Sequence, residues 1–123
     1  MDKSDSCLLG DLLSQRRSSI GQKISEIATA AQLSASYYSS IENSKRIPPT
    51  STLRRILDVL GFTDAEQQLL RQMAAVERGL SPDDADLPDE AQALICDIRR
   101  AAAKLPIRFI KALRSEIHEI THF

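Results

Sequence analysis

The sequence predicts an all-α protein, and three observations support this fold class. Apolar residues recur at intervals of three and four along most of the 123-residue chain, which is the spacing of one helix face. No segment shows the period-two alternation of a half-buried strand. Residues that begin or end helices separate the apolar segments, as in the capping box formed by Thr63 and Glu66. We therefore expect helices joined by short loops.

The first two predicted helices are amphipathic. One runs from Leu8 to Arg17 with leucines on one face, and Ser6 or Asp5 is placed to cap its N-terminus. A second, shorter helix follows the polar stretch at 18–21. Its apolar residues lie on one side: Ile24, Ile27, Ala28 and Ala31.

A third helix is predicted from Ala35 to Glu42, after a break of about three residues at 32–34. Ser34 is a good N-cap for this helix, and Tyr38 and Ile41, three positions apart, are expected to face inward. The stretch 43–49 ends in two prolines, which lack amide donors and constrain the residue before them. That stretch is therefore predicted as a loop.

Two longer helices are predicted next. Thr50 or Ser51 caps the first of them, and Gly61 ends it. Its apolar residues are Leu53, Ile56, Leu57 and Leu60. The capping box begins the second helix, and Gly79 ends it. Its inward residues are predicted to be Leu69, Leu70, Met73 and Val76.

The C-terminal part is predicted to hold a linker and further helices. Residues 80–90 contain two prolines and five acids, which is typical of a solvated connection. Two helical segments follow, and the second has a seam spaced three, four and three: Ile110, Leu113, Ile117 and Ile120. We therefore divide the chain into an N-terminal helical domain at 1–79, an acidic linker at 80–90 and a C-terminal helical region at 91–123 whose seam suits dimerisation.

Composition limits the classes of function. The length suits one compact domain or a small domain with an appendage, not two enzymatic domains. The polar N-terminal stretch does not resemble a signal peptide, and no apolar run approaches about 18 residues, so we expect a cytoplasmic protein without membrane contact. Cys7 and Cys96 form no CxxC pair and are interpreted as reduced bystanders. The net charge is −1, and the excess of acids lies in the second half.

Two short helices joined by a tight turn, followed by a loop with two cations, can place the second helix in the major groove of DNA. Residues 33–49, LSASYYSSIENSKRIPP, resemble the recognition helix and following loop of the Xre family, the helix-turn-helix group of Cro and lambda-type repressors. The resemblance covers Leu9 to Phe62. It implies a lambda-repressor-like, five-helix DNA-binding domain followed by C-terminal helices.

The resemblance also implies roles for individual residues. Base edges would be contacted by Ala35, Ser36, Tyr37 and Ser40. Phosphates would be contacted by Lys23, Asn43, Lys45 and Arg46. Arg17 and Glu42 would form a structural ion pair between the first helix and the end of the third, and Tyr38 would pack in the core.

Three positions depart from the family pattern. The glycine of the tight turn is Gln32, the glycine of the loop is Ser44, and the polar residue that often begins the second helix is Ile24. These substitutions bear on the geometry of the turn and on one backbone contact, and they leave the rest of the pattern in place.

A competing motif lies at the C-terminus. Residues 118–122 read HExxH, which on a helix places His118 and His122 one turn apart, as in zinc proteases. A catalytic zinc needs a third protein ligand, and only Phe123 follows the motif. We therefore expect no catalytic residues and no cofactor, and keep the two histidines as a weak metal candidate and a metallopeptidase as a remote alternative.

The leading hypothesis is a homodimeric transcription regulator, a repressor, that binds a palindromic operator through recognition helices about 34 Å apart. The C-terminal seam would form the dimer interface, because an exposed apolar stripe must be buried somewhere. The alternative is that the seam packs within its own subunit. A second functional hypothesis is an antitoxin-type or other partner-binding subunit.

Overall fold

The computed structural model describes residues 8–121, and this range contains α-helices and two short 3-10 helices but no strand. The predicted all-α fold is thereby confirmed. Ser6, Asp5 and Cys7, which entered the sequence predictions, lie outside the described residues. No helix in the described range is long and apolar enough to cross a membrane.

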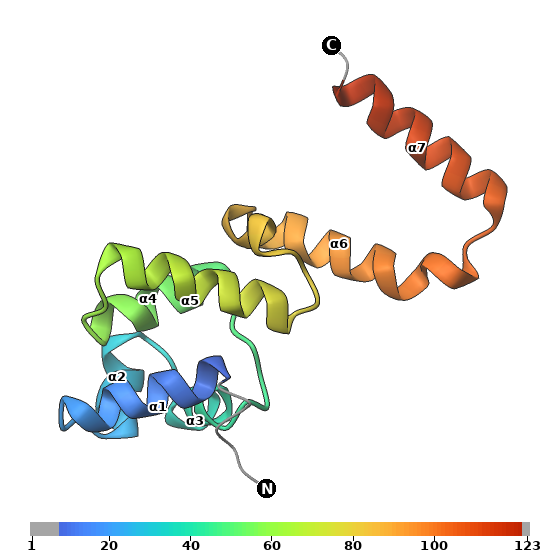
Figure 1. Ribbon diagram of the computed structural model, residues 1–123. Helices are drawn as coiled ribbons and strands as arrows, with labels where there is room; N and C mark the ends of the chain where they lie inside the picture. The colour runs from blue at the N-terminus through green and yellow to red at the C-terminus, as the bar shows by residue number, and fades with distance from the viewer. Residues whose placement is uncertain (1–7, 122–123) are drawn as a thin grey trace, which may run out of the picture.

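The first five helices pack into a head around one core (Figure 1). They are α1 (Leu9–Ser19), α2 (Ile24–Ala30), α3 (Ala35–Glu42), α4 (Thr50–Val59) and α5 (Asp64–Glu77). The apolar faces predicted from spacing in the first four helices provide most of this core, which includes Leu13, Ile27, Tyr38, Ile41, Leu53, Ile56, Leu57 and Leu60. The inward face predicted for α5 is wrong at two positions, because Leu69 is 64% exposed and Val76 is 52% exposed, while α5 buries Leu70 together with Ala74 and Ala75. Because each of the five helices contributes such residues, the shared core fixes the positions of α2 and α3.

The ends of α3 and α5 follow from their capping residues. The Ser34 hydroxyl accepts a hydrogen bond from the Tyr37 amide at 3.1 Å, so α3 starts where its cap predicts. Thr63 and Glu66 form the predicted capping box, in which each side chain accepts from the other residue's amide, at 3.2 and 2.9 Å. These bonds hold the Glu66 carboxylate and keep its pKa below its usual value.

The chain then leaves the head. The 3-10 helix η2 (Pro82–Asp86) and the start of α6 (Asp89–Ala101) follow α5, and Leu80 and Ala85 are buried against Ala75. After η3 (Ala102–Lys104), α7 (Ile107–Thr121) turns back from α6 and lies apart from the head (Figure 1). No residue of α7 is buried. The domain boundaries at 79 and 90 stay predictions.

Candidate nucleic-acid interface

The turn between α2 and α3 is tight and left-handed at one residue. Gln32 has a φ of +63°, and the Leu33 amide donates to the Ala28 carbonyl oxygen at 2.8 Å, which closes the end of α2. The Arg55 guanidinium of α4 donates to the Ala31 carbonyl oxygen at 3.1 Å. Although the family glycine is absent, the backbone keeps the conformation that glycine would favour.

The outer face of α3 is small and polar. Ala35 and Ser36 are exposed, and Tyr37 is half-buried, whereas Tyr38 and Ile41 are buried in the core. Burial raises the pKa of the Tyr38 phenol, so this side chain is a neutral packing group. The exposed face at the start of α3 is therefore what the helix can present to a groove.

Ser40 lies one turn later and is half-buried. Its hydroxyl donates to the Tyr37 carbonyl oxygen at 2.6 Å, and its carbonyl oxygen accepts from the amides of Lys45 and Arg46 at 2.9 and 3.3 Å. Ser40 thus closes the end of α3 and fixes the start of the loop. Its hydroxyl lone pairs stay available for a second hydrogen bond.

The loop after α3 carries its polar side chains outward. Asn43, Ser44, Lys45 and Arg46 are exposed. The Arg46 guanidinium lies over the Tyr37 ring, 5.7 Å from its centroid, so loop and helix are joined by a cation–π contact. Ser44 has a φ of +62°, again where the family has glycine. Arg46 therefore lies beside the exposed face of α3.

Lys23, the remaining residue predicted to contact phosphate, is exposed at the N-terminus of α2. Its backbone amide donates to the Glu26 carboxylate at 2.7 Å, and the residue is exposed. The helix N-terminus and this cation both favour a nearby anion.

Arg17 and Glu42 join α1 to the end of α3. Two hydrogen bonds link the guanidinium to the carboxylate, at 2.7 and 3.0 Å, and a third bond runs from Arg17 to the Gln22 carbonyl oxygen at 3.0 Å. The side chains are 17% and 5% exposed. The hydrogen bond to Glu42 raises the pKa of Arg17. The structure therefore brings the two residues together as a largely buried bidentate pair.

Gly10 allows α1 to lie directly against the end of α3. A Cβ atom at this position would lie 2.5 Å from the Ile41 carbonyl oxygen and 2.6 Å from that of Glu42. Sequence reasoning did not identify this contact, because a helical glycine with no left-handed φ has no local signal.

Sequence reasoning also missed long-range contacts made by the last residue of α5 and the first residue of α6. The Leu9 amide at the start of α1 donates to the Glu77 carboxylate at 2.7 Å. The Thr50 amide at the start of α4 donates to the Asp89 carboxylate at 2.8 Å. These carboxylates cap helices 68 and 39 positions away, and no local sequence motif marks such a partner.

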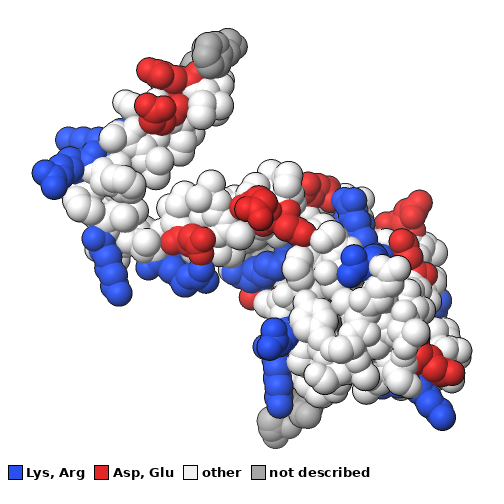
Figure 2. All heavy atoms as spheres, turned by 180° about the vertical axis from the view of Figure 1, so that it is seen from behind, with Lys and Arg blue, Asp and Glu red and all other residues white. Residues whose placement is uncertain are grey.

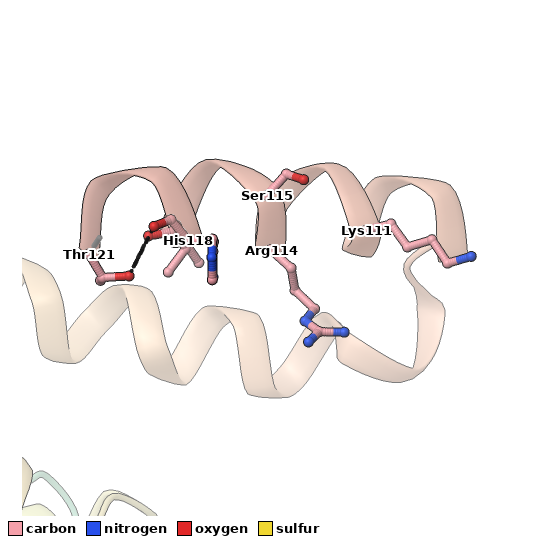
Figure 3. Close-up of a pocket in the computed structure, with 6 residues that line it drawn as sticks. Lys111, Arg114, Ser115, His118 and Thr121 are labelled. Carbon is pink, nitrogen blue, oxygen red and sulfur yellow. Dashed lines mark hydrogen bonds between the residues drawn. The ribbon is translucent and has the colours of Figure 1, made fainter. Parts of the chain in front are cut away.

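The HExxH motif lies only partly in the described range. His118 is on α7, and the Thr121 hydroxyl donates to the carbonyl oxygens of Ile117 and His118, at 3.1 and 3.2 Å (Figure 3). His122 lies outside the described residues. Within residues 8–121, no group of three His, Cys, Asp or Glu side chains could hold a metal ion. The hollow in Figure 3 is lined by α7 alone.

A comparison with protein families identifies the chain at this level. The helix-turn-helix domain family matches residues 8–70, just over half of the chain, so the chain belongs to this family. The match includes α2, the turn and α3, and it supports a DNA-binding regulator. No curated protein and no solved structure matches the chain.

Proposed function

We propose that this helix-turn-helix protein is a cytoplasmic transcriptional repressor of the Xre group that binds a palindromic operator in double-stranded DNA as a homodimer. One observation carries the proposal: Arg46 of the following loop lies over Tyr37, beside the exposed start of α3. A narrow helix face beside phosphate-binding groups fits the major groove and the adjacent backbone.

The chemistry of this face indicates how DNA would be read. Ala35 can contact a thymine methyl group, and Ser36 can donate or accept a hydrogen bond at a base edge. Tyr37 is held by Arg46 and would contact a base or phosphate from a fixed position. Without an arginine or glutamine on this face, much of the specificity would come from DNA shape and from phosphate contacts that fix the register.

Helices α6 and α7, which we call the arm, support the proposed dimer. On α7, Ile117 is 49% exposed and Ile120 is 68% exposed, while Ile110 and Leu113 are half-buried. An apolar seam of this spacing normally packs against another helix. A second copy of the chain would cover it and would bring two recognition helices to one palindrome.

The proposed function can be tested by titrating duplex DNA from the protein's own upstream region. We expect the triple variant Ser36→Ala, Tyr37→Ala and Lys45→Ala to bind about a hundredfold more weakly, since it loses base and phosphate contacts. Lys104→Ala removes one exposed cation far from α3 and serves as the control. Undiminished binding by the triple variant would refute the assignment.

A partner-binding role is the second candidate, favoured by the absence of any buried residue in α7. The same seam could bind an unrelated small protein instead of a second copy. Sedimentation of the purified chain distinguishes the two, because the dimer proposal requires two chains per particle in the absence of other proteins.

A further inference from the structure

A polar cluster ties α6 to the segment that follows the DNA-facing loop. The Asp89 carboxylate accepts from the Thr50 amide at 2.8 Å, the Ser51 hydroxyl at 2.8 Å and, at 3.5 Å, the Ser51 amide. Burial alone would raise the pKa of Asp89, but these hydrogen bonds together outweigh it and lower the pKa. Asp89 therefore acts as the N-terminal cap of α4, although it belongs to α6.

Gln92 is the centre of this cluster and is only 3% exposed. Its amide group donates to the Thr50 hydroxyl at 2.9 Å and to the carbonyl oxygens of Leu87 and Ala85, at 2.9 and 3.2 Å. Its oxygen accepts from the Arg78 guanidinium at 2.6 Å. A buried amide with every group satisfied fixes the relative positions of its partners.

Arg78 connects this cluster to the loop itself. Its guanidinium, half-buried at the end of α5, donates to the carbonyl oxygen of Pro48. Pro48 is buried and directly follows the exposed part of the loop. Burial lowers the pKa of Arg78, yet an arginine stays charged in a protein, so the hydrogen bonds are charge-assisted.

We propose that Arg78, Asp89 and Gln92 are positioning residues that hold the DNA-facing loop, 43–49, in its binding conformation. The proposal rests on the proposed function. The Ser40 carbonyl fixes the start of the loop, and these three residues, which we call the clasp, fix its end. All three lie after residue 70, where the family match ends. The clasp makes the first turns of α6 part of the DNA-binding unit.

Preorganisation explains why the clasp would matter for affinity. Lys45 and Arg46 project from a backbone that is anchored at both ends, so little loop entropy is lost when they meet phosphates. If the C-terminal end of the loop is released, Lys45 and Arg46 must be ordered when DNA binds. The affinity for DNA then falls, although no residue that contacts DNA has changed.

The test compares Asp89→Ala with Glu90→Ala in the full chain. Both substitutions remove one acid from the first turn of α6, and Glu90 is exposed. Charge alone would strengthen DNA binding in both variants, because a repelling carboxylate is lost. If Asp89 positions the loop, DNA binding should instead be about fivefold weaker in Asp89→Ala and not weaker in Glu90→Ala. Asp89→Asn should restore the affinity, since asparagine is an equally good helix cap.

A second measurement does not depend on DNA. Hydrogen exchange of the amides at 45–51 should be about tenfold faster in Asp89→Ala and unchanged in Glu90→Ala. If the two alanine variants exchange alike, or if Asp89→Ala exchanges faster but binds DNA as tightly as the wild type, the proposal is overturned. If the wild-type protein binds no DNA, the proposed function fails, while the exchange data still decide whether the clasp holds the loop.

Discussion

The head and the arm carry the same kind of apolar pattern, but only the head buries it. In α4, Leu53, Ile56 and Leu57 are at most 1% exposed, whereas Ile117 and Ile120 of α7 are about half and two-thirds exposed. A 15-residue helix with no buried residue has little to stabilise it in isolation. The comparison teaches that the head buries its apolar faces within one chain, whereas the seam of α7 stays largely exposed.

The charges on the two regions also differ. In the head, acids and cations form specific contacts, such as the pair of Arg17 and Glu42. On α7, the cations Arg108, Lys111 and Arg114 precede the acids Glu116 and Glu119. Figure 2 shows acidic atoms gathered near the free end of the arm and basic atoms nearer its bend. This order opposes the helix dipole, which again makes an isolated α7 unfavourable.

The largest expected effect on stability comes from removing the ion pair between Arg17 and Glu42 in the head. Arg17→Met leaves the Glu42 carboxylate buried without its partner, and we expect the free energy of unfolding to fall by about 3–5 kcal/mol. Denaturant unfolding followed by circular dichroism measures this loss. Arg54→Met, at an exposed arginine of α4, should change stability by no more than about 0.5 kcal/mol. A comparable effect of both substitutions would contradict the structural role of the pair.

The arm should respond in the opposite way, by losing assembly while the head stays folded. Ile117→Asp places a charge in the proposed seam, and we expect the dimer to dissociate about a hundredfold more readily. Ser115→Asp adds the same charge to an exposed position of α7 and is the matched control. Sedimentation reports the assembly, and the unfolding of the head should be unchanged in both variants. A dimer that survives Ile117→Asp would place the interface elsewhere.

The smallest expected effect on stability concerns the two residues of the head that have a left-handed backbone conformation, Gln32 and Ser44. Gln32→Gly should raise the free energy of unfolding by about 1 kcal/mol, because glycine adopts a φ of +63° without the cost to a side chain. Ser44→Gly should act in the same direction. Gln22→Gly, whose φ is not positive, should instead be neutral or destabilising. Thermal unfolding resolves these differences, and a loss of stability in Gln32→Gly would refute the interpretation of strain.

Most of the fold could be predicted locally. The start of α3 follows from Ser34, and the start of α5 follows from its capping box. The candidate interface could also be predicted from the sequence. Helical spacing predicts that Ala35 and Ser36 are exposed and that Tyr38 is buried, as the structure shows. By contrast, α6 begins at Asp89 inside the stretch predicted as a linker, since its first residues are held by contacts with the head.

The amino-acid order by itself determined most helix ends in the head and the apolar faces of its first four helices, because propensity, capping and periodicity act within a few residues. Only the tertiary structure decided which apolar faces find a partner within the chain and which charged groups cap distant helices. Glu77, Asp89 and Arg78 acquire their roles from residues 30 to 68 positions away. Such contacts depend on how helices pack in space, and packing has no local signature.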